Sequence, residues 1–252
     1  MDVRVPERSA YQLLDYIESY APSPVTFAEL GARDCTETIV FSRYLPNTQI
    51  YAFECNPQTL PLCRKVAREL SNVKLIEKAA TDKDGSVDFF AIDPKKTQTT
   101  WKDGNPGASS LLKASGKYPV EKYVQKRVTV KATRLDSFIA QQGITGIDVL
   151  WMDIQGGELM ALEGLGGKLS DVKLIHTEVE FLEIYKGQPL FDKLYKFLKT
   201  AGFILGGFTA FGEYSADAVF INQRLALPAK SKLRLKLNEQ KLLSKVKANA
   251  PK

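Results

Sequence analysis

Two acidic residues, 25 positions apart, are the first feature of this sequence that could do chemistry. Glu29 stands two residues before Gly31, where an apolar run breaks, and Glu54 ends the next apolar run. A strand that turns at glycine into a helix, followed by a strand ending in a carboxylate, is typical of a βαβ nucleoside site. The sequence therefore predicts a nucleoside-binding turn at residues 27–35, with Glu54 placed to bind ribose hydroxyls.

The turn lacks the glycines that bind phosphate. Dinucleotide sites use G-x-G-x-x-G and phosphate loops use G-x-x-x-x-G-K-[ST], whereas Gly31 stands alone here. The carboxylate of Glu29 would repel a phosphate group, so a cationic ligand that carries adenosine fits better. S-adenosylmethionine has a sulfonium, an ammonium group and a ribose but no phosphate, and we expect it as the cofactor.

Regular elements must bring these residues together. Apolar runs bounded by glycine, proline and charged residues predict strands alternating with helices, which favours a mainly parallel sheet with helices on both faces. The predicted strands are residues 25–30, 49–54, 73–79, 87–92, 126–131, 147–153, 172–181, 203–205 and 216–222. The predicted helices are one that begins at Ser9, then 36–44, 57–70, 135–141, 158–165 and 190–200.

The charge of the chain is concentrated at its end. The net charge is +6, yet residues 229–252 carry eight basic side chains and one acidic one, so the remaining residues sum to −1. A basic protein can indicate a nucleic-acid partner, but here the excess describes only the tail. We expect a helical extension at residues 1–24, one α/β domain at 25–228 and a basic tail at 229–252.

Composition also bears on the compartment. The first residues contain no apolar core of a secretory signal, and no run of about 18 apolar residues occurs. The three cysteines, Cys35, Cys55 and Cys63, have no metal-like spacing and fit reduced thiols. We expect a cytoplasmic protein.

Polar residues gather where the predicted strands end. These positions are 29–33, 54–56, 79–82, 153–155 and 178–180. Ligands of parallel α/β sheets bind outside the carboxyl ends of the strands, so the five segments should meet at one edge. A single strand-end acid could equally cap a helix or contact water, but five strand ends together favour a site. Their carboxylates could bind an ammonium group or ribose, or accept a proton from an acceptor hydroxyl.

Six short motifs follow one another along the chain. They are Glu29-Leu30-Gly31-Ala32-Arg33, Tyr51-Ala52-Phe53-Glu54-Cys55-Asn56-Pro57, Ala80-Thr81-Asp82-Lys83-Asp84-Gly85, Thr133-Arg134-Leu135-Asp136-Ser137-Phe138, Asp153-Ile154-Gln155-Gly156-Gly157-Glu158 and Tyr185-Lys186-Gly187-Gln188-Pro189-Leu190-Phe191. Their order and spacing resemble FkbM-type S-adenosylmethionine-dependent methyltransferases, from about residue 25 to 222. The resemblance implies a Rossmann-like class I methyltransferase fold with a mainly parallel seven-stranded sheet. It also implies O-methylation of a saccharide or natural-product hydroxyl.

The resemblance further implies which residues bind the cofactor. The first motif contributes Glu29, Gly31, Ala32 and Arg33; the second contributes Glu54 on the ribose, with Cys55 and Asn56 beside the adenine; the third contributes Ala80, Thr81 and Asp82 around the nucleoside. Asp153 would face the methionine end, near the methyl group that is transferred.

Two positions depart from the family pattern. Cys35 stands where the family usually has Gly, which could alter the close approach of backbone to cofactor. Gln155 stands where the family usually has Glu, which removes an acid that could assist chemistry or bind an ion. These departures keep open a non-catalytic S-adenosylmethionine-binding or regulatory module. A nucleic-acid methyltransferase that uses the basic tail is a further alternative, although the near-neutral body offers nucleic acid no charged track.

Methylation of a hydroxyl near neutral pH needs a base. The candidates are Asp153, Glu178, Glu180 and His176, and the last three share one face of a regular strand. His176 lies several residues before the strand end and is typical of a core histidine, so we predict Asp153 or Glu178 as the base. A pair of strand-end acids could also hold Mg²⁺, but no motif indicates a metal.

Residues 93–120 form a long loop, which is typical of a lid. Trp101 could cover a sugar ring, or the loop could be solvated with one packed aromatic. Ser109 and Ser110 belong to a Ser-Ser-Leu element similar to the family's. Tyr185 could form the opposite wall of the acceptor site. Alternatively, its segment, residues 185–191, could serve only as a helix entry fixed by Pro189. We expect a small-molecule or glycan acceptor bound by Trp101, Ser109, Ser110 and Tyr185.

The tail mixes leucine with lysine. Its apolar residues follow the helical period only in part, which favours a solvated or disordered extension. The alternative is attachment to anionic lipid, to which each basic residue near the surface contributes about 1 kcal/mol. Such a contact would make the cytoplasmic protein peripheral to a membrane.

Overall fold

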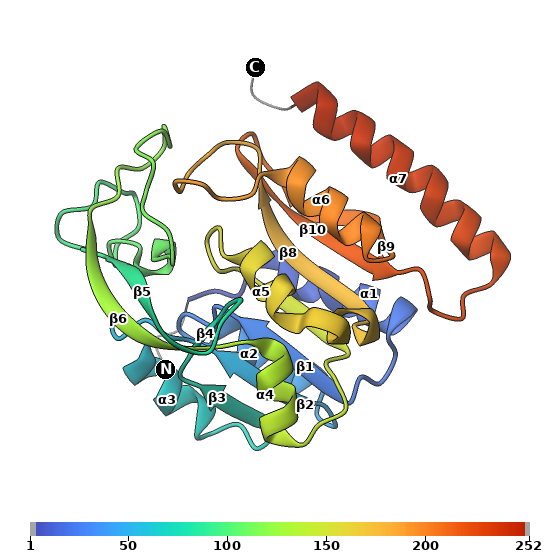
Figure 1. The fold of residues 1–252 in the computed structure, drawn as a ribbon, viewed down its shortest axis with the longest axis horizontal. Coiled ribbons are helices and arrows are strands. Elements are labelled where there is room, and N and C mark those ends of the chain that lie inside the picture. Colours follow the sequence, from blue (N-terminus) through green and yellow to red (C-terminus); the bar gives the residue numbers. More distant parts are fainter. Residues whose placement is uncertain (1–3, 250–252) are drawn as a thin grey trace.

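The computed structural model describes residues 4–249 and shows a seven-stranded sheet with the strand order β3-β2-β1-β7-β8-β10-β9 (Figure 1). The first five strands in that order are parallel, whereas β10 runs antiparallel to both β8 and β9. The strands are β1 (Thr26–Leu30), β2 (Gln49–Phe53), β3 (Val73–Ile76), β7 (Val149–Met152), β8 (Leu174–Glu180), β9 (Phe203–Phe211) and β10 (Ser215–Asn222). The predicted mainly parallel sheet is confirmed.

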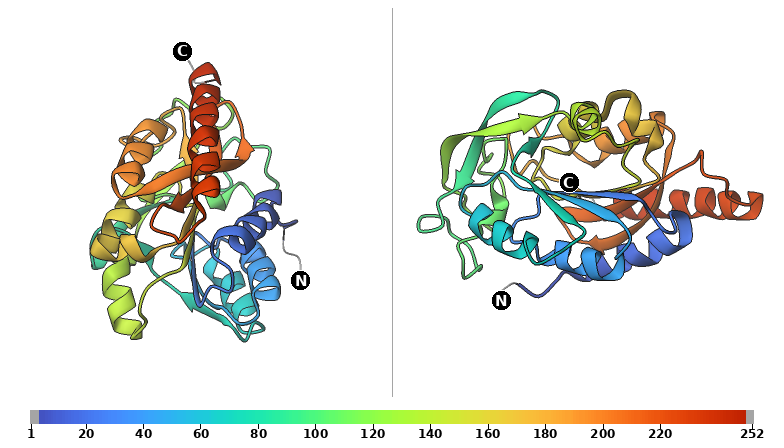
Figure 2. Two further views of the ribbon diagram at one scale, coloured as in Figure 1. Left: turned by 90° about the vertical axis from the view of Figure 1, so that its right-hand side faces the viewer. Right: turned by 90° about the horizontal axis from the view of Figure 1, so that it is seen from below.

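Helices cover both faces of this sheet, as the sequence predicts (Figure 2). One face is covered by α1 (Arg8–Tyr20), α2 (Thr36–Tyr44) and α3 (Leu60–Ala67). The other is covered by α4 (Leu135–Gln142), α5 (Glu158–Leu165) and α6 (Phe191–Thr200). The described residues also form two short 3₁₀ helices, η1 (Pro106–Ala108) in the long loop and η2 (Gly166–Asp171) directly after α5.

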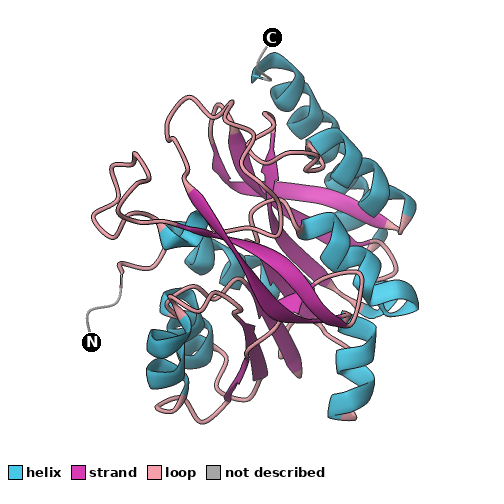
Figure 3. Cartoon of the chain, turned by 60° about the vertical axis from the view of Figure 1, so that its left-hand side comes forward, coloured by secondary structure: helices cyan, strands magenta, loops and turns pink. Residues whose placement is uncertain are grey.

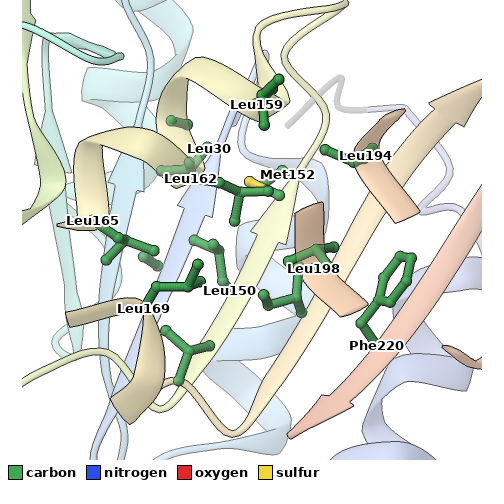
Figure 4. Close-up of a cluster of buried hydrophobic side chains, with 14 of the residues drawn as sticks. Leu30, Leu150, Met152, Leu159, Leu162, Leu165, Leu169, Leu194, Leu198 and Phe220 are labelled. Carbon is green, nitrogen blue, oxygen red and sulfur yellow. The ribbon is translucent and has the colours of Figure 1, made fainter. Parts of the chain in front are cut away.

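The alternation of side chains along β1 divides the core into two layers. Phe27 packs on the side of α1 to α3, while Ala28 and Leu30 pack on the side of α4 to α6. Figure 4 shows the second layer, where Leu162 of α5 and Leu198 of α6 meet the strands. Because both faces of the strand are buried, β1 reads as a continuous apolar run that Glu29 alone interrupts.

A second sheet of three strands lies beside the first (Figure 3). It contains β4 (Ala79–Ala80), β5 (Gly85–Ile92) and β6 (Gln125–Thr133), in the order β4-β6-β5. The sequence predicts β5 and β6 as strands but not that they leave the main sheet. It also predicts one strand at 73–79, whereas the structure divides this segment between β3 and β4.

The C-terminal segment is a helix, α7 (Ala229–Asn249), rather than the solvated extension that its sequence favours. It packs along the edge strand β9 and contributes Leu235 to one core layer and Val246 to the other. Asn238 Nδ2 donates to the Gly206 carbonyl at 2.9 Å, and the Leu205 N–H donates to the Glu239 carboxylate at 3.1 Å. The helix thus satisfies backbone groups that an edge strand would leave open.

Glu239 is the main polar contact between α7 and the rest of the fold. It is buried, pairs with Lys199, and accepts hydrogen bonds from Leu205 and the Tyr195 hydroxyl.

Within residues 4–249 no helix has both the length and the apolar character needed to cross a bilayer.

We predict that Glu239→Ala lowers the free energy of unfolding by about 1–3 kcal/mol, because a buried N–H of β9 loses its acceptor. Gln240→Ala, at the exposed neighbouring position, is the matched control and should change stability by less than about 0.5 kcal/mol. Urea unfolding followed by circular dichroism measures both. Equal unfolding midpoints for Glu239→Ala and the unmodified protein would contradict the proposed role of this contact.

Candidate active site

A cavity of about 260 Å³ lies at the carboxyl ends of the central strands. Its wall includes Gly31 after β1, Glu54 after β2, Asp153 after β7 and Glu178 near the end of β8. The chain continues from β1 to β2 on one side, while β7 lies on the other side of β1, so the cavity is at the switch point of the sheet. The predicted convergence of strand ends is present in the structure.

The turn at Gly31 forms the floor of the cavity. Its φ of +88° lies in the left-handed region that favours glycine, and a Cβ here would lie 1.9 Å from the Asp153 carbonyl oxygen. The N–H groups of Gly31 and Ala32 donate to the Phe53 carbonyl at 3.0 and 2.9 Å. Only a glycine therefore lets the turn pass between the ends of β2 and β7.

Cys35 also has left-handed backbone geometry, with φ of +60°. Glycine adopts this geometry without strain, which gives a backbone reason for the glycine that the family usually has here. The Cys35 side chain is buried against the same core layer as α2, and Cys35 does not line the cavity. The substitution therefore changes the turn beneath the cavity and leaves the cavity wall itself intact.

Glu54 is held in the wall by the backbone. Its carboxylate accepts hydrogen bonds from the N–H groups of Arg33 (2.7 Å), Cys55 (2.8 Å) and Asn56 (2.6 Å). Burial raises the pKa of Glu54, while these three bonds act in the opposite direction. Glu54 thus links the first turn to the end of β2 and fixes its own orientation.

Glu29 does not line the cavity, although it is only two residues from Gly31. It shares the face of Phe27, where its Oε2 accepts a hydrogen bond from the Thr38 hydroxyl of α2 at 2.5 Å and its Oε1 has no partner. Burial raises the pKa of Glu29 well above its usual range. The structure therefore places this acid beneath the turn.

An acidic pair faces the cavity from β7 and β8, and Gln155 joins its two members. The Gln155 Nε2 donates to Asp153 Oδ1 at 2.6 Å and to Glu178 Oε2 at 2.9 Å. The Tyr185 hydroxyl donates to Gln155 Oε1 at 2.9 Å, and the Ser110 hydroxyl donates to the Gln155 carbonyl at 2.6 Å. Ser110 and Tyr185 therefore position Gln155 and do not themselves line the cavity.

Burial makes these acids weak. Burial raises the pKa of Asp153, with the Gln155 hydrogen bond acting against it. Burial also raises the pKa of Glu178 well above its usual range, and the charges of Asp153 and Glu180 add to this shift. Burial raises the pKa of Glu7 and of Glu158 to about 7.

Among the described residues, the cavity wall holds more carboxyl groups than basic side chains. It contains six carboxyl groups but only three basic side chains, Arg4, Arg33 and Lys78. The carboxyl groups belong to Glu7, Glu37, Glu54, Glu121, Asp153 and Glu178. A cationic ligand would relieve the repulsion among these groups, whereas a phosphate would increase it.

The long loop, which spans residues 93–124 between β5 and β6 in the structure, contributes to the cavity wall. The Arg33 guanidinium lies 4.7 Å from the Trp101 ring centroid and forms an ion pair with Asp103 at 2.9 Å. Glu121 accepts hydrogen bonds from the Tyr123 hydroxyl at 2.6 Å and from Asn105 Nδ2 at 3.0 Å. The contacts of Arg33 join the loop to the turn after β1. The contacts of Glu121 join Asn105, in the middle of the loop, to the residues just before β6.

Several other predicted site residues line the cavity, and some do not. Those in the wall are Arg33, Cys55, Asn56, Ala80, Trp101 and Ser109. Those outside it are Ala32, Thr81 and Asp82, in addition to the residues described above. Thr81 instead donates its hydroxyl hydrogen to Asp82 at 2.9 Å, beside the small sheet.

The N-terminal segment supplies wall residues that the sequence patterns do not indicate. Arg4 pairs with Asp34 and Glu37, both at 2.9 Å, and the Glu7 N–H donates to Glu37 at 3.2 Å. The loop likewise contributes Tyr118 and Tyr123 to the wall. Asp34 and Glu37 lie 30 and 33 residues from Arg4, and no local motif marks such a contact.

His176 is a buried core residue, in agreement with its position before the strand end. Its ring stacks on Trp151 with centroids 3.9 Å apart, its Nε2 lies 2.8 Å from the Thr209 hydroxyl, and burial lowers its pKa to about 3. Within the described part of the chain, no group of three or more His, Cys, Asp or Glu side chains is arranged to hold a metal ion.

Comparison with known proteins shows which family this chain belongs to. A family model for the methyltransferase FkbM domain matches residues 29–205. The chain is 28% identical over 179 residues to the 2-O-methyltransferase NoeI of Sinorhizobium fredii (strain NBRC 101917 / NGR234), covering 70% of this chain and 71% of NoeI. A solved methyltransferase FkbM from Methylobacillus flagellatus KT matches with a TM-score of 0.50 and 10% identity, over 86% of this chain and 56% of that one. The chain therefore belongs to the FkbM methyltransferase family and is an S-adenosylmethionine-dependent methyltransferase.

Proposed function

We propose that this methyltransferase methylates a hydroxyl group of a saccharide or natural-product acceptor. The observation that carries the proposal is the pair of carboxyl groups, Asp153 and Glu178, facing a cavity beneath the Trp101 loop. The similarity to NoeI supports it, because that relative is a 2-O-methyltransferase by name.

The residues present fit the cofactor. The excess of carboxyl groups over basic side chains in the wall suits its sulfonium and ammonium groups. The residues that would hold it are Gly31, Arg33, Glu54, Cys55, Asn56, Ala80 and Asp153. When bound, S-adenosylmethionine supplies a methyl group activated by the positive sulfur.

The loop supplies surfaces suited to a sugar ring. Trp101, Tyr118 and Tyr123 contribute aromatic residues to the wall, and Ser109 and Glu121 contribute polar ones. Aromatic rings can cover the apolar face of a sugar while nearby oxygens bind its hydroxyls. We assign acceptor binding to this loop, with Tyr185 acting through Gln155.

Proton removal is the chemical task of the acidic pair. The acceptor hydroxyl must lose its proton as its oxygen attacks, and a carboxylate oxygen of Asp153 or Glu178 would accept it. A raised pKa makes each carboxylate a stronger base near neutral pH, once it is ionised. The Gln155 amide donates one N–H to each carboxylate and so favours the ionised form without adding a third charge.

A direct test offers the protein labelled S-adenosylmethionine with free saccharides, saccharide conjugates or RNA. Transfer of label to a saccharide hydroxyl, located by mass spectrometry after hydrolysis, supports the proposal. Transfer to RNA would instead favour the nucleic-acid alternative. Binding of S-adenosylhomocysteine without transfer to any acceptor would favour a non-catalytic module.

We predict that Asp153→Asn or Glu178→Gln, whichever removes the base, lowers kcat by about 10²–10⁴-fold. Both substitutions keep the side-chain volume, so each variant should fold. S-adenosylhomocysteine should stabilise Glu178→Gln in thermal unfolding as it does the unmodified protein, whereas Asp153→Asn also changes a residue assigned to the cofactor. Single-turnover methyl transfer with the accepted saccharide measures the effect. If both variants retain kcat within about twofold, neither carboxylate is the base.

We predict that Gln155→Glu moves the rise of kcat/KM with pH toward higher pH. Both acids already have raised pKa values, so their basic forms increase as pH rises, and a third carboxylate would raise those pKa values further. Gln142→Glu, at an exposed position of α4, is the matched control and should leave the profile unchanged. An unchanged profile in Gln155→Glu would exclude this electrostatic role.

We predict that Glu54→Gln weakens binding of S-adenosylhomocysteine at least about tenfold, because the amide cannot accept all three backbone hydrogen bonds that orient this side chain. Glu29→Gln is the matched comparison and should change the Kd by only a few fold, because Glu29 lies outside the cavity. Isothermal titration calorimetry measures both constants. Equal losses in the two variants would place Glu29 against the cofactor.

A further inference from the structure

We propose that the outward face of α7 binds the surface of an anionic membrane. The inference starts from how the helix is held. Its inner face is occupied, because Leu235, Glu239 and Val246 are buried against the sheet and its core layers. The contacts of Asn238 and Glu239 with β9 fix which side of α7 faces outward.

The exposed surface of α7 is rich in basic residues. Residues 229–249 contain seven basic side chains, namely Lys230, Lys232, Arg234, Lys236, Lys241, Lys245 and Lys247, and all seven residues are exposed. The Lys245 Nζ lies 4.0 Å from the Phe211 ring centroid and so turns toward β9. The single acidic residue of the helix, Glu239, is buried and paired with Lys199, so it does not neutralise the outer face. From Lys230 to Lys247 the helix spans roughly 25 Å at 1.5 Å per residue.

Two leucines lie within this basic face. Leu233 is 59% exposed and Leu237 is 53% exposed, and four-residue spacing places them on one side of the helix. Lys230 and Lys241 each lie one helical turn beyond this pair, so the order along the outer side is basic, apolar, apolar, basic. An interfacial helix has this arrangement, with apolar side chains entering the headgroup region and lysines reaching the charged surface.

The position of α7 leaves the active site open. The helix lies at the outer edge of the sheet, and β8 and β10 separate β9 from β7 (Figures 1 and 2). A membrane that contacts α7 would therefore not have to cover the carboxyl ends of β1 and β7.

The side chains favour a lipid surface over nucleic acid. Single-stranded nucleic acid is bound with stacked aromatic rings, and α7 has none. Six of its seven basic residues are lysines, which act as point charges, and the exposed leucines have no role in a phosphate track. Both features are expected at an anionic bilayer, where charge and apolar insertion act together.

We predict that the full chain sediments with vesicles of phosphatidylcholine and phosphatidylglycerol but not with phosphatidylcholine alone. Lys230→Gln combined with Lys241→Gln should lower the partition coefficient roughly thirtyfold, since each basic residue contributes about a factor of five. Leu233→Gln combined with Leu237→Gln should lower it several-fold at unchanged charge. The control combines Lys65→Gln with Lys83→Gln, two exposed lysines outside α7, and should bind as the unmodified chain does.

Each variant is first checked by thermal unfolding and by binding of S-adenosylhomocysteine, so that vesicle binding is compared among folded proteins. The vesicle assay needs no methyl transfer, and its result is independent of the proposed acceptor. Equal sedimentation with both kinds of vesicle would overturn the proposal. So would tighter binding to a single-stranded RNA than to the vesicles, or self-association through α7 detected by light scattering and abolished by the leucine substitutions.

Discussion

The close approach of the first turn to the end of β7 is the constraint on which the active site depends. Gly31 has no side chain, so its backbone can lie against the Asp153 carbonyl, while its N–H is bound by the Phe53 carbonyl of β2. This contact joins three strand ends at the point where the sheet order reverses. The Glu54 carboxylate holds the turn through the Arg33 N–H, and the Arg33 guanidinium contacts Trp101 of the long loop. The floor, wall and cover of the cavity are thus one connected structure.

Charge explains how this connected structure is adapted to its ligand. Carboxyl groups outnumber basic side chains in the wall, and burial raises the pKa of Asp153 and Glu178. A glutamate at position 155 would place a further acid between them. The glutamine found there instead gives one N–H to each carboxylate. This departure from the family pattern therefore stabilises the ionised form of the pair, and it gives no reason to regard the site as degenerate.

The N-terminal segment contributes to the active site, whereas the C-terminal helix does not. Arg4 and Glu7 come from before α1 and close one side of the cavity. The C-terminal α7 lies away from it and covers the edge strand β9, which protects backbone groups from pairing with another chain. The inner face of α7 carries this structural role, while its basic residues are exposed on the outside of the fold.

The sequence by itself determined the alternation of strands and helices, the turn at Gly31 and the acids that end the strands, because each is a local pattern of few residues. The family resemblance followed from the same short motifs. Only the tertiary structure decided that Glu29 lies beneath the turn, since the alternation of β1 places it with Phe27 against α2. It also decided that Ser110 and Tyr185 hold Gln155, and that α7 is docked. The last two outcomes rest on contacts between residues 30 or more positions apart, and the first on the packing of α2 against β1. No periodicity or motif records which partner in the fold a side chain will meet.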